Sequence, residues 1–336
     1  PGNNTGFEEL SAPYKILYTM FEATRWPREW VNAGNAANQV WVPSEFCRDG
    51  LLASGCESPV NVVPLGIDPD MFYPLGKAKR NDETLVIGFA GVCSRRKGFD
   101  LLVDAFRKEF KDGEDVKLVV QTHSVLSSTL PNDSRIVVRD AVITTDELRE
   151  FYQSIDLLVL PTRSEGTGLT PLEAMACGTC AAVTNWGGSK DYLSDDCLRI
   201  AVEALEDCKD YWQCGGQRAK PSMASLRYCM RWAYEHEQEL AQMGKMAAER
   251  VAKDWTYEQT AKTIVGLLRK ANINERISVE RKDVVIWRGD PQIVNTYAGQ
   301  FLRDYPRELT AAQMARLNPS DVHERGFSCE TRIRRV

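Results

Sequence analysis

The stretch that decides the fold is EGTGLTPLEAMACG, at residues 165–178. It follows an apolar run at residues 156–161, which predicts a fully buried strand, and residues 171–177 have the apolar spacing of a helix. Glycines between a strand and a helix let backbone N–H groups approach a ligand, and the start of a helix favours an anion such as phosphate. Glu165 and Glu173 stand at the two ends of an E-x7-E frame. The stretch therefore predicts a site for an anionic ligand at the end of a strand.

Predicted strands and helices alternate on both sides of this stretch. Strand patterns occur at residues 85–90, 116–120, 135–138, 156–161 and 180–184, and helix patterns at residues 99–106 and 145–152. This alternation favours a doubly wound, Rossmann-like α/β domain over roughly residues 80–200. In such sheets ligands bind at the carboxyl ends of the strands, which is where Glu165 is expected.

The remaining chain carries fewer strand patterns. Residues 39–43 and 61–66 predict strands, and the polar residues 72–84 predict a linker between two domains. Residues 222–270 have a helical pattern, and residues 283–287 predict one more strand. This last strand could complete the sheet that the first strands begin, which would place the tail beside residues 1–68.

Composition and charge exclude several classes of protein. The chain has 336 residues, of which 43% are hydrophobic and 26% charged, as expected for about two soluble globular domains. Its net charge of −5 argues against non-specific binding to nucleic acid. No apolar run approaches the ~18 residues of a membrane-spanning helix, and the first residues do not have the pattern of a signal peptide. Ten cysteines without framework spacing are expected to be reduced, and the C-x-x-C of Cys177 and Cys180 lacks the second ligand pair of a metal site.

Three segments of the sequence together resemble one known family, the retaining GT-B glycosyltransferases of the family 4 type. The motifs are WVPSEF at 41–46 with VPLGID at 63–68, GFAG at 88–91 with RKG at 96–98, and residues 161–178. The resemblance covers about residues 38–265. It implies an α/β GT-B fold with two Rossmann-like domains that face a cleft, the N-terminal one incomplete in chain order. The chain could be a truncated, reduced or rearranged transferase.

The resemblance also implies a division into domains. Residues 1–72 would form a partial N-terminal, acceptor-side domain, and residues 80–265 the nucleotide-sugar donor domain. Residues 266–336 would be a cross-over helix and a tail that packs on the N-terminal domain.

By resemblance, two residues are expected at the catalytic centre. Glu165 would contact the donor sugar, and Lys97 would neutralise charge on the leaving nucleoside diphosphate. Glu173 would bind the ribose of the nucleotide. The backbone of the next segment would hold the diphosphate and sugar, through Gly166, Thr167, Gly168, Leu169 and Thr170.

Further positions are candidates for binding. Many relatives in the resembled family have an arginine six residues before the lysine, where this chain has Gly91, so Arg95 or Arg96 would have to replace it. Arg139 could approach the edge of the base or form a surface salt bridge. Glu22 is a candidate acceptor-side contact. Trp26 and Trp30 are expected to pack in the core rather than to form a platform for a sugar.

The function expected from these residues is that of a metal-independent, retaining, hexosyltransferase-like enzyme. It would move a sugar from a nucleoside-diphosphate sugar, with UDP or GDP as the favoured nucleotide, to a hydroxyl acceptor, with no cofactor and no metal. One alternative is a non-catalytic nucleotide-sugar-binding module, because the acceptor half is short. Another is a GT-B nucleotide-sugar epimerase. The expected location is cytoplasmic, or peripheral at a membrane.

Overall fold

The computed structural model describes residues 7, 12, 14–75, 84–123, 133–208 and 215–271, and the backbone of residues 284–288 and 332–333. The chain divides into two compact units. Unit 1 consists of Pro1–Asp68, Asp207–Gln217 and Thr256–Val336, and unit 2 of Pro69–Glu206 and Arg218–Trp255. Most of the predicted linker, residues 76–83, lies outside the described residues.

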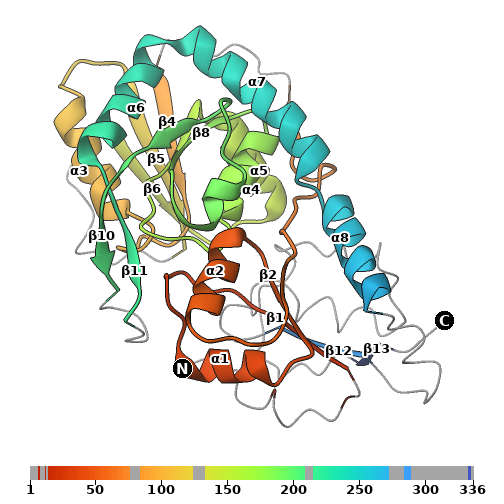
Figure 1. Cartoon of the computed structure of the whole chain (residues 1–336). Helices are drawn as coiled ribbons and strands as arrows, with labels where there is room; N and C mark the ends of the chain where they lie inside the picture. The colour runs from red at the N-terminus through yellow and green to blue at the C-terminus, as the bar shows by residue number, and fades with distance from the viewer. Residues whose placement is uncertain are drawn as a thin grey trace. The chain divides into compact units, whose positions relative to one another are not determined.

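Unit 2 contains a six-stranded sheet in the order β6-β5-β4-β7-β8-β9, in which all neighbouring strands are parallel (Figure 1). Its strands are β4 (Leu85–Ala90), β5 (Val116–Thr122), β6 (Ile136–Asp140), β7 (Leu157–Leu160), β8 (Cys180–Thr184) and β9 (Leu198–Ile200). The chain winds outward in one direction from β4 and in the other from β7, so the boundary between these two strands is the topological switch point of the sheet. This arrangement confirms the Rossmann-like prediction.

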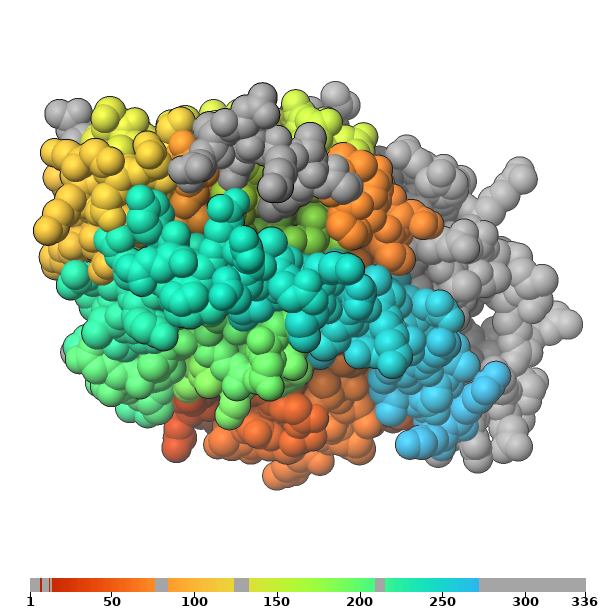
Figure 2. All heavy atoms as spheres, turned by 90° about the horizontal axis from the view of Figure 1, so that it is seen from above, coloured from red at the N-terminus to blue at the C-terminus, as the bar shows by residue number. Residues whose placement is uncertain are grey.

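Helices cover both faces of this sheet. They are α3 (Phe99–Glu109), α4 (Thr145–Ser154), α5 (Leu169–Ala176), the 3-10 helix η2 (Gly187–Asp191), α6 (Met223–Glu235) and α7 (Glu237–Asp254). Apolar side chains of α3 and α6 pack with Ile87 and Phe89 of β4 in one core cluster. On the opposite face, Phe151 and Ile155 lie against Gly88. In Figure 2 the atoms of α6 and α7, coloured teal, form a continuous band along unit 2.

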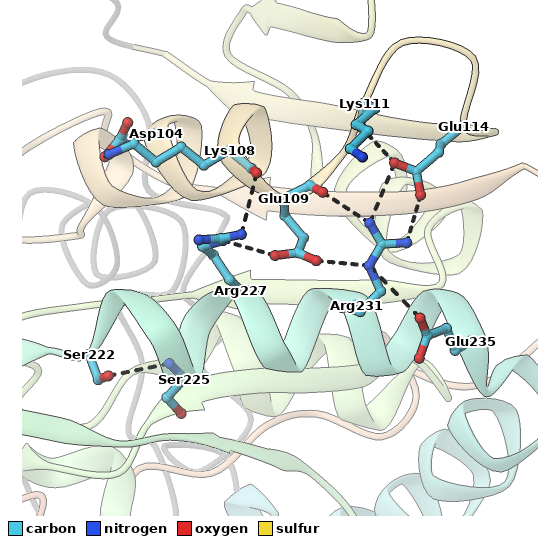
Figure 3. Close-up of polar contacts among 10 residues, drawn as sticks. All are labelled: Asp104, Lys108, Glu109, Lys111, Glu114, Ser222, Ser225, Arg227, Arg231 and Glu235. Carbon is cyan, nitrogen blue, oxygen red and sulfur yellow. Dashed lines mark hydrogen bonds and ion pairs between the residues drawn. The ribbon is translucent and has the colours of Figure 1, made fainter.

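An ion-pair cluster fastens α6 to α3, as Figure 3 shows. Arg231 of α6 contacts Glu109 at 2.8 Å and Glu114 at 2.6 Å, and Arg227 contacts Glu109 at 2.8 Å. The hydrogen bond from Arg231 holds the pKa of Glu114 below its ordinary value. The cluster therefore fixes the far end of α3, whose first turn begins directly after Lys97.

The sheet of unit 1 has the order β13-β12-β1-β2-β3. Its strands are β1 (Lys15–Tyr18), β2 (Gln39–Val42), β3 (Val60–Val62), β12 (Val284–Arg288) and β13 (Arg332–Ile333). Strand β12 is parallel to β1, with Lys15 opposite Val285, and β13 is antiparallel to β12. The predicted strand near residue 285 therefore does extend the sheet formed by the first strands.

The helices of unit 1 are α1 (Arg28–Asn35), α2 (Glu45–Ala53) and α8 (Tyr257–Lys270). Trp26 and Trp30 are both buried, with their ring centroids 6.0 Å apart, which confirms that they are packing residues. Leu267 of α8 packs with Ile16 and other buried residues of this sheet. Because of this packing the whole of α8 belongs to unit 1, whereas the sequence placed the domain boundary inside it, at residue 265.

A two-stranded ribbon of β10 (Val202–Asp207) and β11 (Gln217–Pro221) was not predicted. Its strands carry several charged residues, and a Lys220–Glu203 pair at 2.9 Å joins them. No helix among the described residues is both long and apolar enough to cross a membrane.

Candidate functional site

Lys97 and Glu165 meet at the switch point of the unit 2 sheet. Lys97 lies in the loop after β4, and Glu165 in the loop after β7. The Lys97 Nζ is 2.7 Å from Oε1 of Glu165, and Nη1 of Arg96 is 3.4 Å from the same oxygen. The structure therefore brings three of the predicted site residues together, at the position where open α/β sheets bind ligands.

The Glu165 side chain is only 7% exposed. Burial alone would raise its pKa, but Lys97 and Arg96 outweigh this effect, and the pKa of Glu165 lies below its ordinary value. The hydroxyl of Thr162 also donates to Oε1, at 3.2 Å. Glu165 is therefore a buried, ionised carboxylate whose charge is balanced by two cations.

Gly98 allows Lys97 to reach Glu165. It caps the N-terminus of α3 with φ 75°, and a Cβ at this position would lie 1.9 Å from the backbone oxygen of Pro161. Only glycine permits this close approach of the loop to the end of β7. The backbone N–H of Arg163 donates to the carbonyl of Arg96 at 2.7 Å and joins the two loops there.

Arg163 is a residue of the site that the sequence analysis missed. Its buried guanidinium donates to both carboxylate oxygens of Asp100 at 2.8 Å and to the carbonyl of Arg95. Arg163 therefore ties the loop after β7 to the loop and first helical turn after β4. Its position directly after a buried strand was the available signal.

The two candidate arginines differ in their surroundings. Arg96 lies beside Glu165 and donates to the carbonyl of Ser164 at 2.9 Å. Arg95 is exposed, and its guanidinium pairs with Glu206 at 3.3 Å. Gly91 has φ 130°, a conformation that would strain an arginine at that position. The geometry thus favours Arg96 as the cation that supplements Lys97.

The segment from Gly166 to Thr170 leads into α5, which begins at Leu169, two residues earlier than predicted. Gly168 caps this helix, and its carbonyl accepts a hydrogen bond from the buried hydroxyl of Tyr192 at 2.8 Å. The first N–H groups of a helix have no partner within it. Among the described residues, the buried hydroxyls of Ser164 and Thr167 also have no hydrogen-bond partner. The hydroxyls of Ser164 and Thr167, in the loop before α5, are therefore donors that a ligand could use.

Glu173 lies one turn into α5 and is buried. The hydroxyl of Tyr152, on α4, donates to its Oε2 at 2.7 Å. Burial raises the pKa of Glu173 to about 7, and Tyr152 and Lys97 oppose this rise. The pKa values of the two glutamates of the E-x7-E frame are therefore shifted in opposite directions, down for Glu165 and up for Glu173.

Two further predicted residues belong to other elements of the chain. Arg139 is exposed on β6, in register with Gln121 of β5. Glu22 belongs to unit 1, four residues after the end of β1, and is half-buried. Their assignments to the base and the acceptor stay predictions.

The cysteines of the C-x-x-C motif are buried, free thiols. Burial raises the pKa of Cys180 to about 12, so this thiol is not a thiolate at neutral pH. Within the described ranges, no group of three or more His, Cys, Asp or Glu side chains is arranged to hold a metal ion.

Known proteins resemble the part of the chain that carries this site. Residues 84–210 match the family model described as Glycosyl transferases group 1. The chain is 31% identical over 176 residues to D-inositol 3-phosphate glycosyltransferase of Paenarthrobacter aurescens, a match that covers 45% of this chain and 43% of that protein. It is 28% identical over 184 residues to alpha-maltose-1-phosphate synthase of Mycobacterium tuberculosis, covering 48% and 47%. The matches thus span less than half the length of these curated relatives.

Solved structures show the same fold. Alr3699/HepE from Anabaena, in complex with UDP and glucose, matches with a TM-score of 0.61 at 15% identity, over 76% of this chain and 72% of that one. Sucrose-phosphate synthase from Thermosynechococcus elongatus matches with a TM-score of 0.57 at 20% identity, over 72% and 60%. These neighbours are GT-B glycosyltransferases, so the predicted α/β, GT-B fold class is confirmed.

Proposed function

We propose that this chain is a glycosyltransferase that moves a hexose from a nucleoside-diphosphate sugar to a hydroxyl acceptor. The match to the group 1 model covers the part of the chain that carries Lys97, Glu165 and Glu173. The single observation that carries the proposal is the meeting of Lys97 and Glu165 at the switch point, at the start of α5. Such a place suits a ligand with both a negatively charged and a hydroxyl-rich part.

The diphosphate of the donor fits the start of α5. The first amides of this helix and the unpaired hydroxyls of Ser164 and Thr167 are donors that suit phosphate oxygens. An ammonium group has three donors, so Lys97 can contact Glu165 and a phosphate oxygen together. Arg96 adds a second positive charge. Because these groups can balance the charge of the diphosphate, we propose that transfer needs no divalent metal.

The sugar of the donor is assigned to Glu165. Its ionised carboxylate is an acceptor for sugar hydroxyls, and its two cations keep it charged without solvent. Glu173, at the other end of the frame, is assigned to the ribose. This division places the bond to be broken between the two glutamates.

We propose that transfer retains the configuration at the anomeric carbon. The bond from that carbon to the phosphate oxygen breaks, and the acceptor oxygen bonds to the carbon on the same face. The acceptor's proton passes to the leaving phosphate oxygen. Lys97 and Arg96 stabilise the charge that develops on this oxygen, and no nucleophilic side chain is required. A UDP-sugar is the proposed donor, because the HepE structure contains UDP with glucose.

A donor screen tests this proposal. Purified protein is incubated with UDP-, GDP-, ADP- and TDP-sugars, with EDTA present, and both thermal shift and release of nucleoside diphosphate are measured. We expect binding and slow hydrolysis with at least one donor. Lys97→Ala should weaken donor binding roughly 10- to 100-fold, the loss of a charge-assisted hydrogen bond. Lys108→Ala, an exposed lysine on α3, is the matched control and should change nothing.

Three outcomes would contradict parts of the proposal. Binding without turnover for every donor would make the chain a binding module. Binding that disappears in EDTA and returns with Mn²⁺ would show that a metal carries the phosphate charge. Equal effects of Lys97→Ala and Lys108→Ala would remove Lys97 from the site.

A further inference from the structure

A buried hydrogen bond joins Tyr152 to Glu173. Both side chains are buried, and they come from different helices, α4 and α5. The phenolic hydroxyl donates to Oε2 at 2.7 Å, and this is the one hydrogen bond that the Glu173 carboxylate makes within the described residues. An ionised carboxylate can accept about four hydrogen bonds. Oε1 therefore remains available as an acceptor.

Tyr152 is itself firmly placed. Its ring packs against Phe72, with centroids 6.1 Å apart, and against Phe151 at 5.8 Å. Its carbonyl accepts a hydrogen bond from the hydroxyl of Thr179 at 2.6 Å. A hydroxyl held by such packing restricts the rotation of the carboxylate that it contacts.

We propose that Tyr152 is a positioning residue that holds Oε2 of Glu173 and thereby presents Oε1 to a hydroxyl of the donor's ribose. This inference rests on the proposed function, because it assigns the ligand of Glu173. Tyr152 does not touch the reacting atoms, and it acts through Glu173. Removal of its hydroxyl should therefore weaken donor binding rather than change the chemical step.

The titratable neighbours of Glu173 give the contact a measurable signature. They are Tyr152 on α4, Lys97 in the loop before α3, and Cys177 one turn further along α5. Burial raises the pKa of Glu173 to about 7, and the hydrogen bond from Tyr152 opposes the rise. Loss of the hydroxyl therefore moves this pKa upward. Since ribose hydroxyls favour the ionised carboxylate, donor affinity should fall as the pH drops below that pKa.

The test measures the Kd of UDP-glucose by calorimetry from pH 6 to pH 8.5. UDP-glucose is the probe because its diphosphate is esterified at both ends and does not titrate in this range. For Tyr152→Phe we expect a midpoint roughly one pH unit higher than in the wild type. Relative to the wild type, the variant should therefore bind UDP-glucose about tenfold more weakly at pH 6 and less than twofold more weakly at pH 8.5, in addition to any loss of affinity that is the same at every pH.

Two further variants complete the experiment. Tyr234→Phe removes a hydroxyl from α6, where the ring packs against Phe110, and should leave the profile unchanged. Glu173→Gln removes the titrating group, so its profile should be flat, and this variant also serves if Tyr152→Phe does not fold.

The outcomes separate this inference from the proposed function. If the wild type binds no nucleotide sugar, the proposed function and this assignment both fail. If the wild type binds UDP-glucose but Tyr152→Phe shifts the affinity equally at every pH, Tyr152 has only a structural role and this assignment alone is wrong. A sloped profile in Glu173→Gln would overturn it in the same way.

Discussion

Removal of Lys97 should leave the buried Glu165 carboxylate with only one cation, and we expect this change to destabilise the protein. The two side chains are 16% and 7% exposed, and their charged atoms are 2.7 Å apart. Breaking a buried pair by removing one partner costs about 3–5 kcal/mol. Arg96 stays at 3.4 Å from the same oxygen. We therefore expect Lys97→Met to cost about 3 kcal/mol at pH 7, the lower end of this range.

The loss of stability caused by Lys97→Met should be smaller at acid pH than at neutral pH. The pKa of Glu165 is below its ordinary value in the folded protein, so its ionised form stabilises the fold above the ordinary value. This contribution is lost as the pH falls through the lowered pKa. The difference in free energy of unfolding between wild type and Lys97→Met should therefore shrink as the pH falls below the ordinary value of 4.5 and through the lowered pKa of Glu165.

A double-mutant cycle measured by urea denaturation provides the assay. The free energy of unfolding is determined for the wild type, Lys97→Met, Glu165→Gln and the double variant. In the Glu165→Gln background, Lys97→Met should cost less than about 1 kcal/mol, because no buried charge is left unpaired. An equal cost in both backgrounds would refute the reasoning.

Three other changes have predicted results. Gly98→Ala should lower the free energy of unfolding, measured by thermal denaturation, by about 3 kcal/mol or more, because its Cβ would lie 1.9 Å from a backbone oxygen. Gly113→Ala, with φ 92° and nothing within 4 Å, should lower it by only about 1–2 kcal/mol. Equal losses in the two variants would contradict the close approach at Gly98. Arg231→Met should destabilise unit 2 by about 1–2 kcal/mol at pH 7, and by less at pH values where Glu114 is protonated. A loss of stability that does not depend on pH would contradict the ion pair. Glu165→Ala should lower transfer about 100-fold, or about 2.7 kcal/mol of barrier, with UDP affinity nearly unchanged; a matching loss of affinity would place Glu165 on the nucleotide.

The position of the site was predictable because open α/β sheets bind ligands at the carboxyl ends of their strands. Lys97 and Glu165 each follow a buried apolar strand, and the carboxyl ends of parallel strands lie at one edge of the sheet. The rule predicted the place of Glu165, whereas Lys97 was assigned to the same site by the family resemblance. Neither indicated that they form an ion pair, because this depends on how closely the loop at Gly98 approaches β7.

Other features have no signature in the sequence. Tyr152 stands at a position of α4 where the sequence pattern predicts an ordinary core residue. The pattern therefore gave no indication that its hydroxyl contacts a glutamate on another helix. Strands β10 and β11 are rich in charged residues and lack the alternation of polar and apolar residues by which strands are predicted. The predicted strand near residue 285 was correct, but its partner and direction depend on contacts between distant parts of the chain.

The pairing of β12 with β1 sets the order in which the molecule can be completed during synthesis. Lys15 is opposite Val285, so nearly the whole chain is translated between the two residues that pair. At the usual speed of translation this interval lasts roughly 15–55 s. Throughout it, one edge of β1 on the nascent chain is open to pairing with other strands, which is a known route to aggregation.

All the residues of unit 2, which ends at Trp255, are synthesised before β12, which begins at Val284. Unit 2 can therefore fold early, whereas the sheet of unit 1 is completed only when β12 has been synthesised and pairs with β1. A chaperone that shields this edge would protect the chain during the interval. Strand β1 thus precedes every element of unit 2 in the chain, yet the sheet to which it belongs is completed only after unit 2 has been synthesised.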